Sequence, residues 1–175
     1  MVTSWSNGVV LGKFMPLHLG HEYLINTALE HCDFLTIVVC TLQREPIDGD
    51  LRYRWMVNRY QETIAARKAQ VCHLDEDWIP QVPEDCHSPQ VFYGTWAGVL
   101  TALAGRKLDV IFTSETYGDQ VAAYLKCDHF LVDIERRTIP VSGSMIRSNP
   151  LSYVHQMNEE VASYFYGQKN THRRT

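Results

Sequence analysis

The chain lacks the features that mark secreted and membrane proteins. Only five cysteines occur among its 175 residues, and no two of them form a Cys-x-x-Cys pair. An odd number of scattered cysteines indicates reduced thiols rather than a disulfide framework. No apolar run approaches the ~20 residues that a membrane-spanning helix requires, and Met1–Asn7 has no apolar signal-peptide core. We therefore expect a cytoplasmic protein that does not enter a membrane.

The chain also lacks an excess of positive charge and two common phosphate-binding patterns. Its 16 basic and 20 acidic side chains give a net charge of −4, which argues against a general nucleic-acid surface. No Gly-x-Gly-x-x-Gly pattern occurs. Residues 8–14 are one residue short of the P-loop spacing and lack the Ser or Thr that would hold magnesium. These observations argue against both a dinucleotide fingerprint and a P-loop.

What the sequence does contain is a regular alternation of strand and helix patterns. A chain of 175 residues with 45% hydrophobic content can form one compact core. The nearly continuous apolar run at 34–40 is typical of a strand buried on both faces of a parallel sheet. The alternation predicts a doubly wound, Rossmann-like α/β domain with a five-stranded parallel sheet over residues 8–167, then a polar tail at 168–175. We expect strands at 9–14, 34–40, 69–74, 109–113 and 129–132, and helices at 19–32, 51–68, 90–103, 118–125 and 151–165.

The segment Gly12–His21 is the most informative part of the sequence. A β-branched run leads into it and an amphipathic run leads out, so His18 and His21 come at the start of a helix. Free backbone N–H groups and the positive end of the helix dipole favour a bound anion there. Two imidazoles add donors where charge develops on a phosphate or a departing pyrophosphate, which predicts a nucleotidyl-transfer site. The alternatives are a metal pair, disfavoured because no further ligands follow at a recognisable spacing, and two surface histidines that only cap a helix.

A second cluster, Ser142–Arg147, has the composition of another phosphate cradle. Two hydroxyls and Gly143 open a helical turn, and Arg147 follows one turn later. Backbone N–H groups, hydroxyls and a guanidinium can together hold phosphate oxygens. Alone, the cluster would more simply be a serine-rich helix cap with an exposed arginine. The presence of the two histidines earlier in the chain favours the phosphate interpretation.

Two arginines and two tryptophans are candidate substrate contacts. Arg52 and Arg54 begin a predicted helix and cannot face the same way two residues apart. One could reach a substrate phosphate while the other pairs with an acid such as Asp50, although two solvated arginines are a serious alternative. Trp78 and Trp96 lie in or beside the predicted loop at 75–89, where either could stack on a flat heteroaromatic ring. Burial in a core is the commoner role of a tryptophan.

Several polar residues follow the ends of predicted strands. Ligands of doubly wound sheets lie beyond the carboxyl ends of the strands, at the switch in strand order. Lys13, Asp75, Ser114 and Asp133 each follow a strand and are expected at that edge. Ser114 and its neighbour Glu115 are candidates for contact with an adenine or a ribose.

These motifs resemble those of a known superfamily. Gly12–His21 looks like the Gly-x-Phe-x-Pro-x-His-x-Gly-His signature of the adenylyl- and cytidylyltransferases that share the (H/T)IGH nucleotidyltransferase fold. Val141–Arg147 resembles their later Ile-Ser-x-Thr-x-Ile-Arg motif, with Ser144 where many relatives have threonine. More narrowly, the chain resembles the nicotinamide-mononucleotide (NMN) adenylyltransferase domain of the NadR group of NAD-synthesis proteins. That resemblance covers roughly Val9 to Phe165 and includes Leu51–Trp55, Thr113–Glu115 and Arg136–Pro150.

The resemblance implies a reaction and roles for the residues that match. ATP and NMN would give NAD and pyrophosphate, with His18 and His21 on the ATP phosphates and His21 nearest the transferred group. Lys13 would lie near the α-phosphate or the incoming phosphate, while Ser144 and Arg147 would hold the β- and γ-phosphates. Magnesium would come with ATP, held mainly by phosphate and water and not by a metal site of the protein.

The complete set of expected site residues falls into three groups. The catalytic group is His18, His21, Lys13 and Arg147. The ATP-binding group is Gly12, Phe14, Met15, Gly20, Ser114, Ser142, Ser144, Met145 and Ile146. The group that binds the second substrate is Arg52, Arg54, Asp75, Trp78 and Trp96.

The sequence leaves two other functions open. One is a related transferase with a different acceptor, such as phosphopantetheine, nicotinate mononucleotide, a sugar phosphate or glycerol phosphate. The other is a non-catalytic module that binds NAD or ATP and reports its level to a partner. We expect small-molecule partners, ATP and NMN, and neither nucleic acid nor membrane; a homo-oligomer is left open. Members of the NadR group commonly carry a kinase domain with a P-loop, and kinase activity is not expected of this chain.

Overall fold

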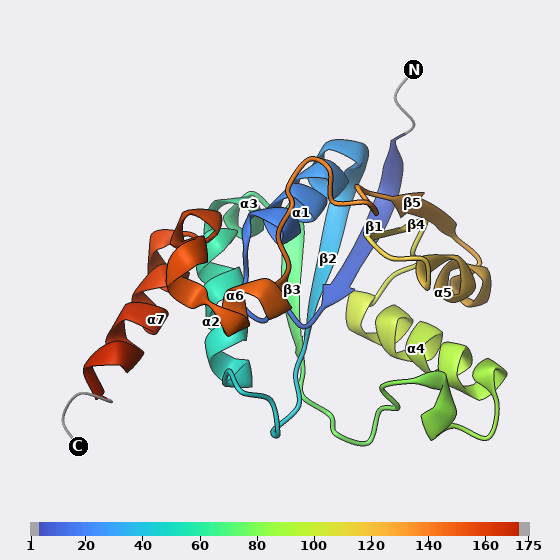
Figure 1. Cartoon of the computed structure of the whole chain (residues 1–175). Coiled ribbons are helices and arrows are strands. Elements are labelled where there is room, and N and C mark those ends of the chain that lie inside the picture. The colour runs from blue at the N-terminus through green and yellow to red at the C-terminus, as the bar shows by residue number, and fades with distance from the viewer. Residues whose placement is uncertain (1–3, 172–175) are drawn as a thin grey trace.

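The computed structural model describes residues 4–171 and has the predicted five-stranded parallel sheet at its centre (Figure 1). The strand order is β3-β2-β1-β4-β5. The chain therefore builds one half of the sheet outward from β1 and then returns to the other side of β1 to build the second half. This is the doubly wound arrangement, with its switch point between β1 and β4. The strands are β1 (Trp5–Gly12), β2 (Cys32–Cys40), β3 (Ala69–Leu74), β4 (Val110–Thr113) and β5 (Asp128–Leu131).

Strands β1 and β4 stay paired only near the start of β4. β1 pairs with β2 as far as Gly12, whereas its pairing with β4 is confined to Gly8 and Val9. Beyond that point the two strands have no ladder between them, and their carboxyl ends are free to open a crevice. In open α/β sheets this is the usual place for a ligand.

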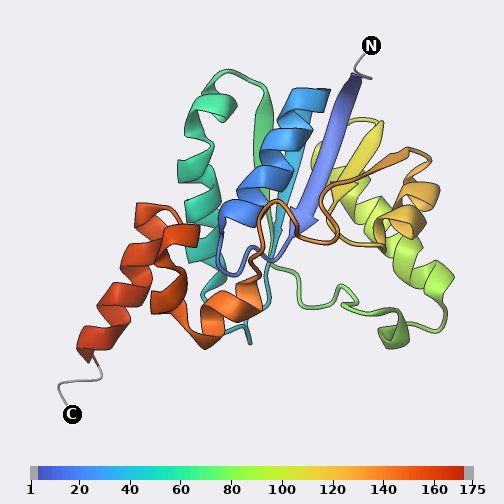
Figure 2. The ribbon, with the colours of Figure 1, turned by 45° about the horizontal axis from the view of Figure 1, so that its top comes forward.

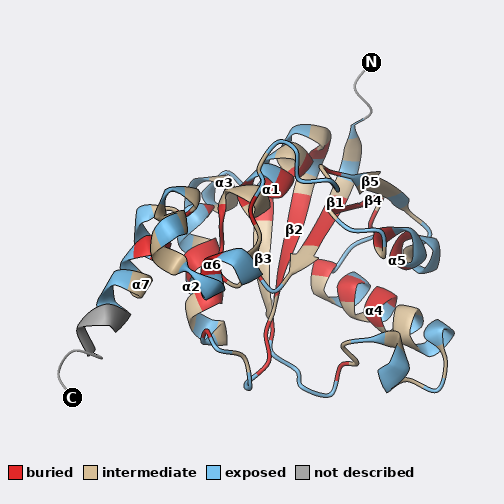
Figure 3. Ribbon diagram, viewed as in Figure 1, coloured by how far each residue is buried: buried red, intermediate tan, exposed pale blue. Residues whose placement is uncertain are grey.

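Helices cover both faces of the sheet (Figures 1 and 2). Successive strand residues point to opposite faces, so Val10 lies in the core shared with α1 and α2, and Val9 lies in the core shared with α4 and α5. The inner strands are largely buried, as Figure 3 shows. This two-sided burial accounts for the continuous apolar runs in the sequence. The helices named here are α1 (Leu19–His31), α2 (Gly49–Arg59), α4 (Pro89–Ala104) and α5 (Gly118–Leu125).

The remaining helical segments are short or lie near the C-terminus. Within residues 4–171, no helix has both the length and the apolar character needed to cross a membrane. The segments are α3 (Gln61–Ala65), the 3₁₀ helix η1 (Pro83–Asp85), α6 (Gly143–Ser148), the 3₁₀ helix η2 (Pro150–Gln156) and α7 (Glu159–Thr171).

Three predicted boundaries are wrong. β1 ends at Gly12 rather than at residue 14, because Phe14 has a φ of +46° and cannot continue a strand. The helix predicted at 51–68 is interrupted at Tyr60, whose buried ring anchors the junction of α2 and α3. The helix predicted at 151–165 is η2 followed by α7, which is capped by the Asn158 carboxamide.

The predicted polar tail overlaps the last helix. Helix α7 continues to Thr171, so residues 168–171, assigned to the tail, are helical. Residues 172–175 of that predicted tail lie outside the described part of the chain.

Candidate active site

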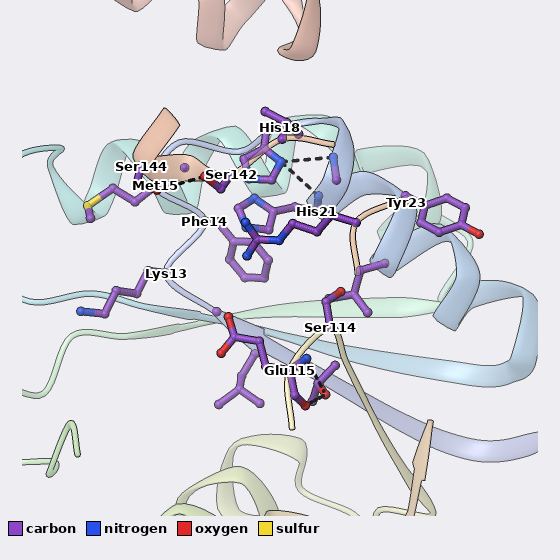
Figure 4. A pocket seen from close by; sticks show the side chains of 18 of the residues that line it. Lys13, Phe14, Met15, His18, His21, Tyr23, Ser114, Glu115, Ser142 and Ser144 are labelled. Atoms are coloured by element: carbon purple, nitrogen blue, oxygen red, sulfur yellow. Dashed lines mark hydrogen bonds between the residues drawn. The ribbon is translucent and has the colours of Figure 1, made fainter. Parts of the chain in front are cut away.

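A cavity of about 590 Å³ opens at the carboxyl ends of β1 and β4, at the switch point of the sheet. Its walls come from the β1–α1 turn, the segment after β4, the loop after β5 and the start of α6. Figure 4 shows His18 and His21 on one side of this cavity, with Ser114 and Glu115 on the other. The predicted residues that line it are Gly12, Lys13, Phe14, Met15, His18, Gly20, His21, Trp96, Ser114, Ser142, Ser144 and Arg147.

His18 is the N-cap of α1. Its Nδ1 accepts hydrogen bonds from the backbone N–H groups of Gly20 (3.1 Å) and His21 (3.4 Å). A neutral imidazole that accepts at Nδ1 carries its proton on Nε2, which is therefore the ring's donor. A Cβ at position 20 would lie 3.1 Å from the His18 ring, so glycine leaves room for the cap. The histidine caps the helix and keeps an N–H for a ligand, so the two uses suggested by the sequence are compatible.

The two imidazoles form one stacked unit. The ring centroids of His18 and His21 are 3.7 Å apart, and Phe14 packs edge-on against His21 at 5.0 Å. Burial, followed by the positive charge of Arg136, lowers the pKa of His18 to about 4. Burial, followed by His18 and Arg136, lowers the pKa of His21 well below its usual value. Both rings are therefore neutral at pH 7, even though a hydrogen bond with the Pro16 backbone acts in the opposite direction on the pKa of His21.

The positive charge beside the histidines comes in part from Arg136, which was not among the predicted site residues. Arg136 lines the cavity and lies in the loop after β5. The Asp133 carboxylate shapes that loop by accepting from the backbone N–H groups of Arg137 (2.9 Å), Thr138 (3.0 Å) and Ile139 (3.3 Å). Asp133 and Arg136 both have positive φ, at +46° and +50°. Such unusual backbone persists where the surroundings hold it, often at functional sites. The adjacent Arg136-Arg137 pair was the available sequence signal.

The predicted phosphate-binding cluster Ser142–Arg147 lies against the β1–α1 turn, which carries the histidines. Ser142 caps α6 and lies 3.0 Å from the Ser144 hydroxyl, and both line the cavity. Arg147 Nη1 donates to the Met15 carbonyl at 2.5 Å, which ties α6 to the β1–α1 turn. A Cβ at Gly143 would lie 2.5 Å from the same carbonyl, so only glycine permits this approach.

Two residues of the predicted ATP-binding group do not line the cavity. Met145 is exposed, and Ile146 is fully buried in the core that α1 and α2 share. Since α6 turns through about 100° per residue, these two side chains point away from the face that carries Ser144 and Arg147.

Arg52 does not reach the cavity, which corrects its predicted role. Its side chain is 0% exposed and donates to the Lys13 carbonyl (2.7 Å), the Ile47 carbonyl (3.0 Å) and Glu45 (2.5 Å). Arg52 therefore joins the segments that follow β1 and β2. The Lys13 ammonium is 2.7 Å from Glu45, and Figure 4 shows it directed away from the histidines. These contacts lower the Glu45 pKa in spite of the raising effect of burial, its largest single influence.

The other predicted substrate contacts are mostly outside the cavity. Arg54 and Asp75 are exposed and do not line it. Trp78 is 67% exposed, and its indole N–H donates to Glu76 at 2.8 Å. Trp96 is buried but does line the cavity, and its indole N–H donates to the Pro80 carbonyl at 3.0 Å. Several other lining residues besides Arg136 were not predicted from the sequence, among them Tyr23, Cys40, Gln81 and Tyr117.

Known proteins resemble this chain in both sequence and fold. No protein-family model matches it. It is 30% identical over 177 residues to the trifunctional NAD biosynthesis/regulator protein NadR of Escherichia coli K12, a match that covers 90% of this chain and 40% of NadR. A structure of NadR in complex with NAD and AMP-PNP matches with a TM-score of 0.68 at 20% identity, over 91% of this chain and 46% of that one. A bifunctional NMN adenylyltransferase/ADP ribose pyrophosphatase from Francisella tularensis, in complex with AMP and a manganese ion, matches with a TM-score of 0.61 at 16% identity, over 90% and 44%.

The chain spans less than half the length of each of these relatives. The structural matches establish a shared α/β fold, and the sequence match adds a relationship that extends over nearly the whole of this chain. Together they agree with the resemblance predicted from the two motifs: this chain is similar in sequence to part of NadR, and it shares the α/β fold of NadR and of the bifunctional NMN adenylyltransferase.

Proposed function

We propose that this chain is a nicotinamide-nucleotide adenylyltransferase, which transfers AMP from ATP to NMN and releases pyrophosphate. The observation that carries the proposal is the pair of stacked, neutral histidines at the start of α1, with Arg136 and Arg147 lining the same cavity. The relationship to a protein named for NAD biosynthesis, and the fold match to an NMN adenylyltransferase, support the choice of pyridine nucleotide.

The chemistry needs positioning and charge stabilisation but no covalent intermediate. A phosphate oxygen of NMN attacks the α-phosphorus of ATP and forms the new P–O bond. The bond from the α-phosphorus to the bridging oxygen breaks, and pyrophosphate leaves with the electron pair. The phosphate nucleophile is already ionised at pH 7, so no side-chain base has to take a proton from it. Fixed donors that meet the charge as it develops then supply most of the acceleration.

Each part of the cavity has a role in this step. The N–H donors of His18 and His21 serve the transferred phosphoryl group at the N-terminal end of α1, where the helix dipole favours negative charge. The guanidinium groups of Arg136 and Arg147 stabilise the charge of the pyrophosphate as it leaves. Ser142 and Ser144 add hydroxyl donors on the same wall.

Divalent metal enters this reaction as part of the nucleotide substrate. Within residues 4–171, no three His, Cys, Asp or Glu side chains are grouped as a metal site. The Asp133 carboxylate, which lines the cavity, is already bonded to backbone N–H groups. In this proposal Mg²⁺ comes with ATP and is held mainly by phosphate oxygens and water.

Pyrophosphate release tests the proposal. Purified protein with Mg²⁺ and ATP is offered NMN, nicotinate mononucleotide, phosphopantetheine, a sugar phosphate or glycerol phosphate in parallel. We expect release with NMN, with NAD as the product. Release with a different acceptor only would contradict the assigned substrate. Tight nucleotide binding without release for any acceptor would contradict the enzyme and favour a sensor.

A further inference from the structure

Each half of the sheet contains a cluster of one aspartate, one histidine and one threonine. In the second half, His129 on the edge strand β5 lies 2.8 Å from the Thr113 hydroxyl through Nε2 and 2.7 Å from Asp119 through Nδ1. In the first half, His73 on the edge strand β3 lies 2.8 Å from the Thr41 hydroxyl through Nε2 and 3.6 Å from Asp50 through Nδ1.

The two clusters differ in whether the threonine lines the cavity and bonds a turn of its wall. Thr113 lines the cavity, and its hydroxyl donates to the Glu115 carbonyl at 2.7 Å while accepting from the Glu115 N–H at 3.3 Å. The Thr113 cluster therefore fixes the turn 114–117, which contributes Ser114, Glu115 and Tyr117 to the cavity wall. Thr41 lies outside the cavity lining.

The direction of each hydrogen bond follows from counting protons. A threonine hydroxyl has one proton, and Thr113 gives it to the Glu115 carbonyl. Thr113 must then accept from His129, so Nε2 of His129 carries a hydrogen. Nδ1 faces the Asp119 carboxylate, which keeps the ring in this orientation. The ring is also enclosed, because the His129 side chain is 8% exposed and any Cβ at Gly118 would overlap it.

The order Asp119–His129–Thr113 is that of a nucleophilic triad, but the geometry excludes that role. Thr113 is 2% exposed, and its proton is already committed to the Glu115 carbonyl. A nucleophile must present its oxygen to the substrate and give its proton to the histidine. Here the Thr113 proton is directed at the Glu115 carbonyl and not at the histidine. The second cluster, in the other half of the sheet, is not part of the lining of this cavity.

We propose that His129 is a positioning residue for the nucleotide. Acting through Thr113, it holds the turn 114–117 in the shape that receives the nucleoside end of ATP. The phosphates belong at His18 and His21, and Figure 4 shows Ser114 and Glu115 across the cavity from them. The turn is thus placed to contact a part of ATP that does not react. This inference rests on the proposed adenylyl transfer for the identity of the ligand.

Because the turn 114–117 contacts a part of ATP that does not react, the positioning role of His129 predicts which kinetic constant changes. Contacts that are equally strong in the ground and transition states alter KM and leave kcat nearly unchanged. We expect His129→Leu and Thr113→Val to raise the KM for ATP about tenfold, the size typical of one lost buried hydrogen bond, with kcat within about twofold of wild type. His129→Gln, whose amide can donate in place of Nε2, should restore most of the affinity. The matched control His73→Leu removes the equivalent bond in the other half and should leave both constants unchanged.

Amide hydrogen exchange provides a readout that is independent of turnover. We expect the amides of residues 114–118 to exchange faster in His129→Leu than in wild type, and to keep wild-type rates in His73→Leu. An unchanged KM for ATP in folded His129→Leu, or an equal rise in His73→Leu, would overturn the positioning role. If wild type transfers no AMP to any acceptor, the proposed function fails. Wild-type exchange at 114–118 in His129→Leu would separately refute the link between His129 and the turn.

Discussion

Arg52 and Arg147 both donate a hydrogen bond to the backbone of the β1–α1 turn, but they do so in opposite surroundings. Arg52 reaches the Lys13 carbonyl from within the core, and its other donors are taken by Glu45 and further carbonyls. Arg147 reaches the Met15 carbonyl from the cavity wall, through Nη1. The difference shows that one arginine supports the turn while the other remains available to a phosphate. Both lie in short motifs that resemble family motifs, and only their surroundings distinguish the two roles.

The largest expected effect is on stability, at the buried arginine. Arg52→Met should lower the free energy of unfolding by about 3–5 kcal/mol, because it removes one of the two cations that pair with the mostly buried Glu45 and leaves buried carbonyls without their donor. The measurement is the urea midpoint and slope. Arg54→Met, at an exposed position on the same helix, is the control and should change stability by less than about 0.5 kcal/mol. Equal stability of the Arg52 and Arg54 variants would contradict the supporting role of Arg52.

The next effect is on turnover, at His21, which follows the turn whose carbonyls both arginines contact. His21→Ala should lower kcat by about 10²–10³, the usual loss when one donor to developing charge is removed. His31→Ala, at the other end of α1, changes a histidine outside the cavity lining and should keep the wild-type kcat. Near-normal turnover of a folded His21→Ala protein would refute the role of the histidine pair.

Arg147 should show a smaller loss, with little cost in stability. Arg147→Ala should lower kcat/KM for ATP roughly 10- to 100-fold, in line with the loss of one charged hydrogen bond to phosphate. Arg147→Lys should recover only part of it, because an ammonium cannot form the two-pronged contact of a guanidinium. Steady-state kinetics with ATP as the varied substrate gives the result. An Arg147→Ala protein that unfolds as early as Arg52→Met would show that the two arginines have the same role.

The smallest effect concerns pH and the neutral state of His18. Its pKa is about 4 in the folded protein, below the usual 6.5, so the folded state binds fewer protons between these values. The resulting stability is complete above pH 6.5 and is lost as pH falls toward 4. Wild type should therefore lose about 1–2 kcal/mol more than His18→Gln between about pH 7 and 5, as measured by urea unfolding at both values. Parallel curves for the two proteins would contradict a neutral, buried His18.

The sequence was sufficient for the parts of the site that local chemistry determines. The glycines and histidines of 12–21 and the serine-rich start of α6 are two local motifs, each read within a stretch of ten residues, and both line the cavity at the switch point. The role of Arg52 could not be read in this way, because it depends on Glu45 folding back beneath the turn. Arg136 was missed because its place comes from an irregular loop that Asp133 holds together, and such loops have no periodicity.

The interruption of the helix predicted at 51–68 has a similar cause. The apolar pattern continues past residue 60, and nothing local ends the helix there. Tyr60 is drawn into the core, and its hydroxyl reaches Asn26 on α1 at 3.4 Å. A tertiary contact between two helices therefore decides a boundary that propensity alone places elsewhere.

The most direct test of the central claim follows the α-phosphate of ATP. Wild-type protein is incubated with Mg²⁺, NMN and ATP labelled at the α-phosphorus, and the products are separated. We expect the label in NAD, in amounts equal to the pyrophosphate released, and almost none in NAD with His21→Ala. Label that stays in ATP, or that appears as free AMP in wild type, would contradict adenylyl transfer at this cavity.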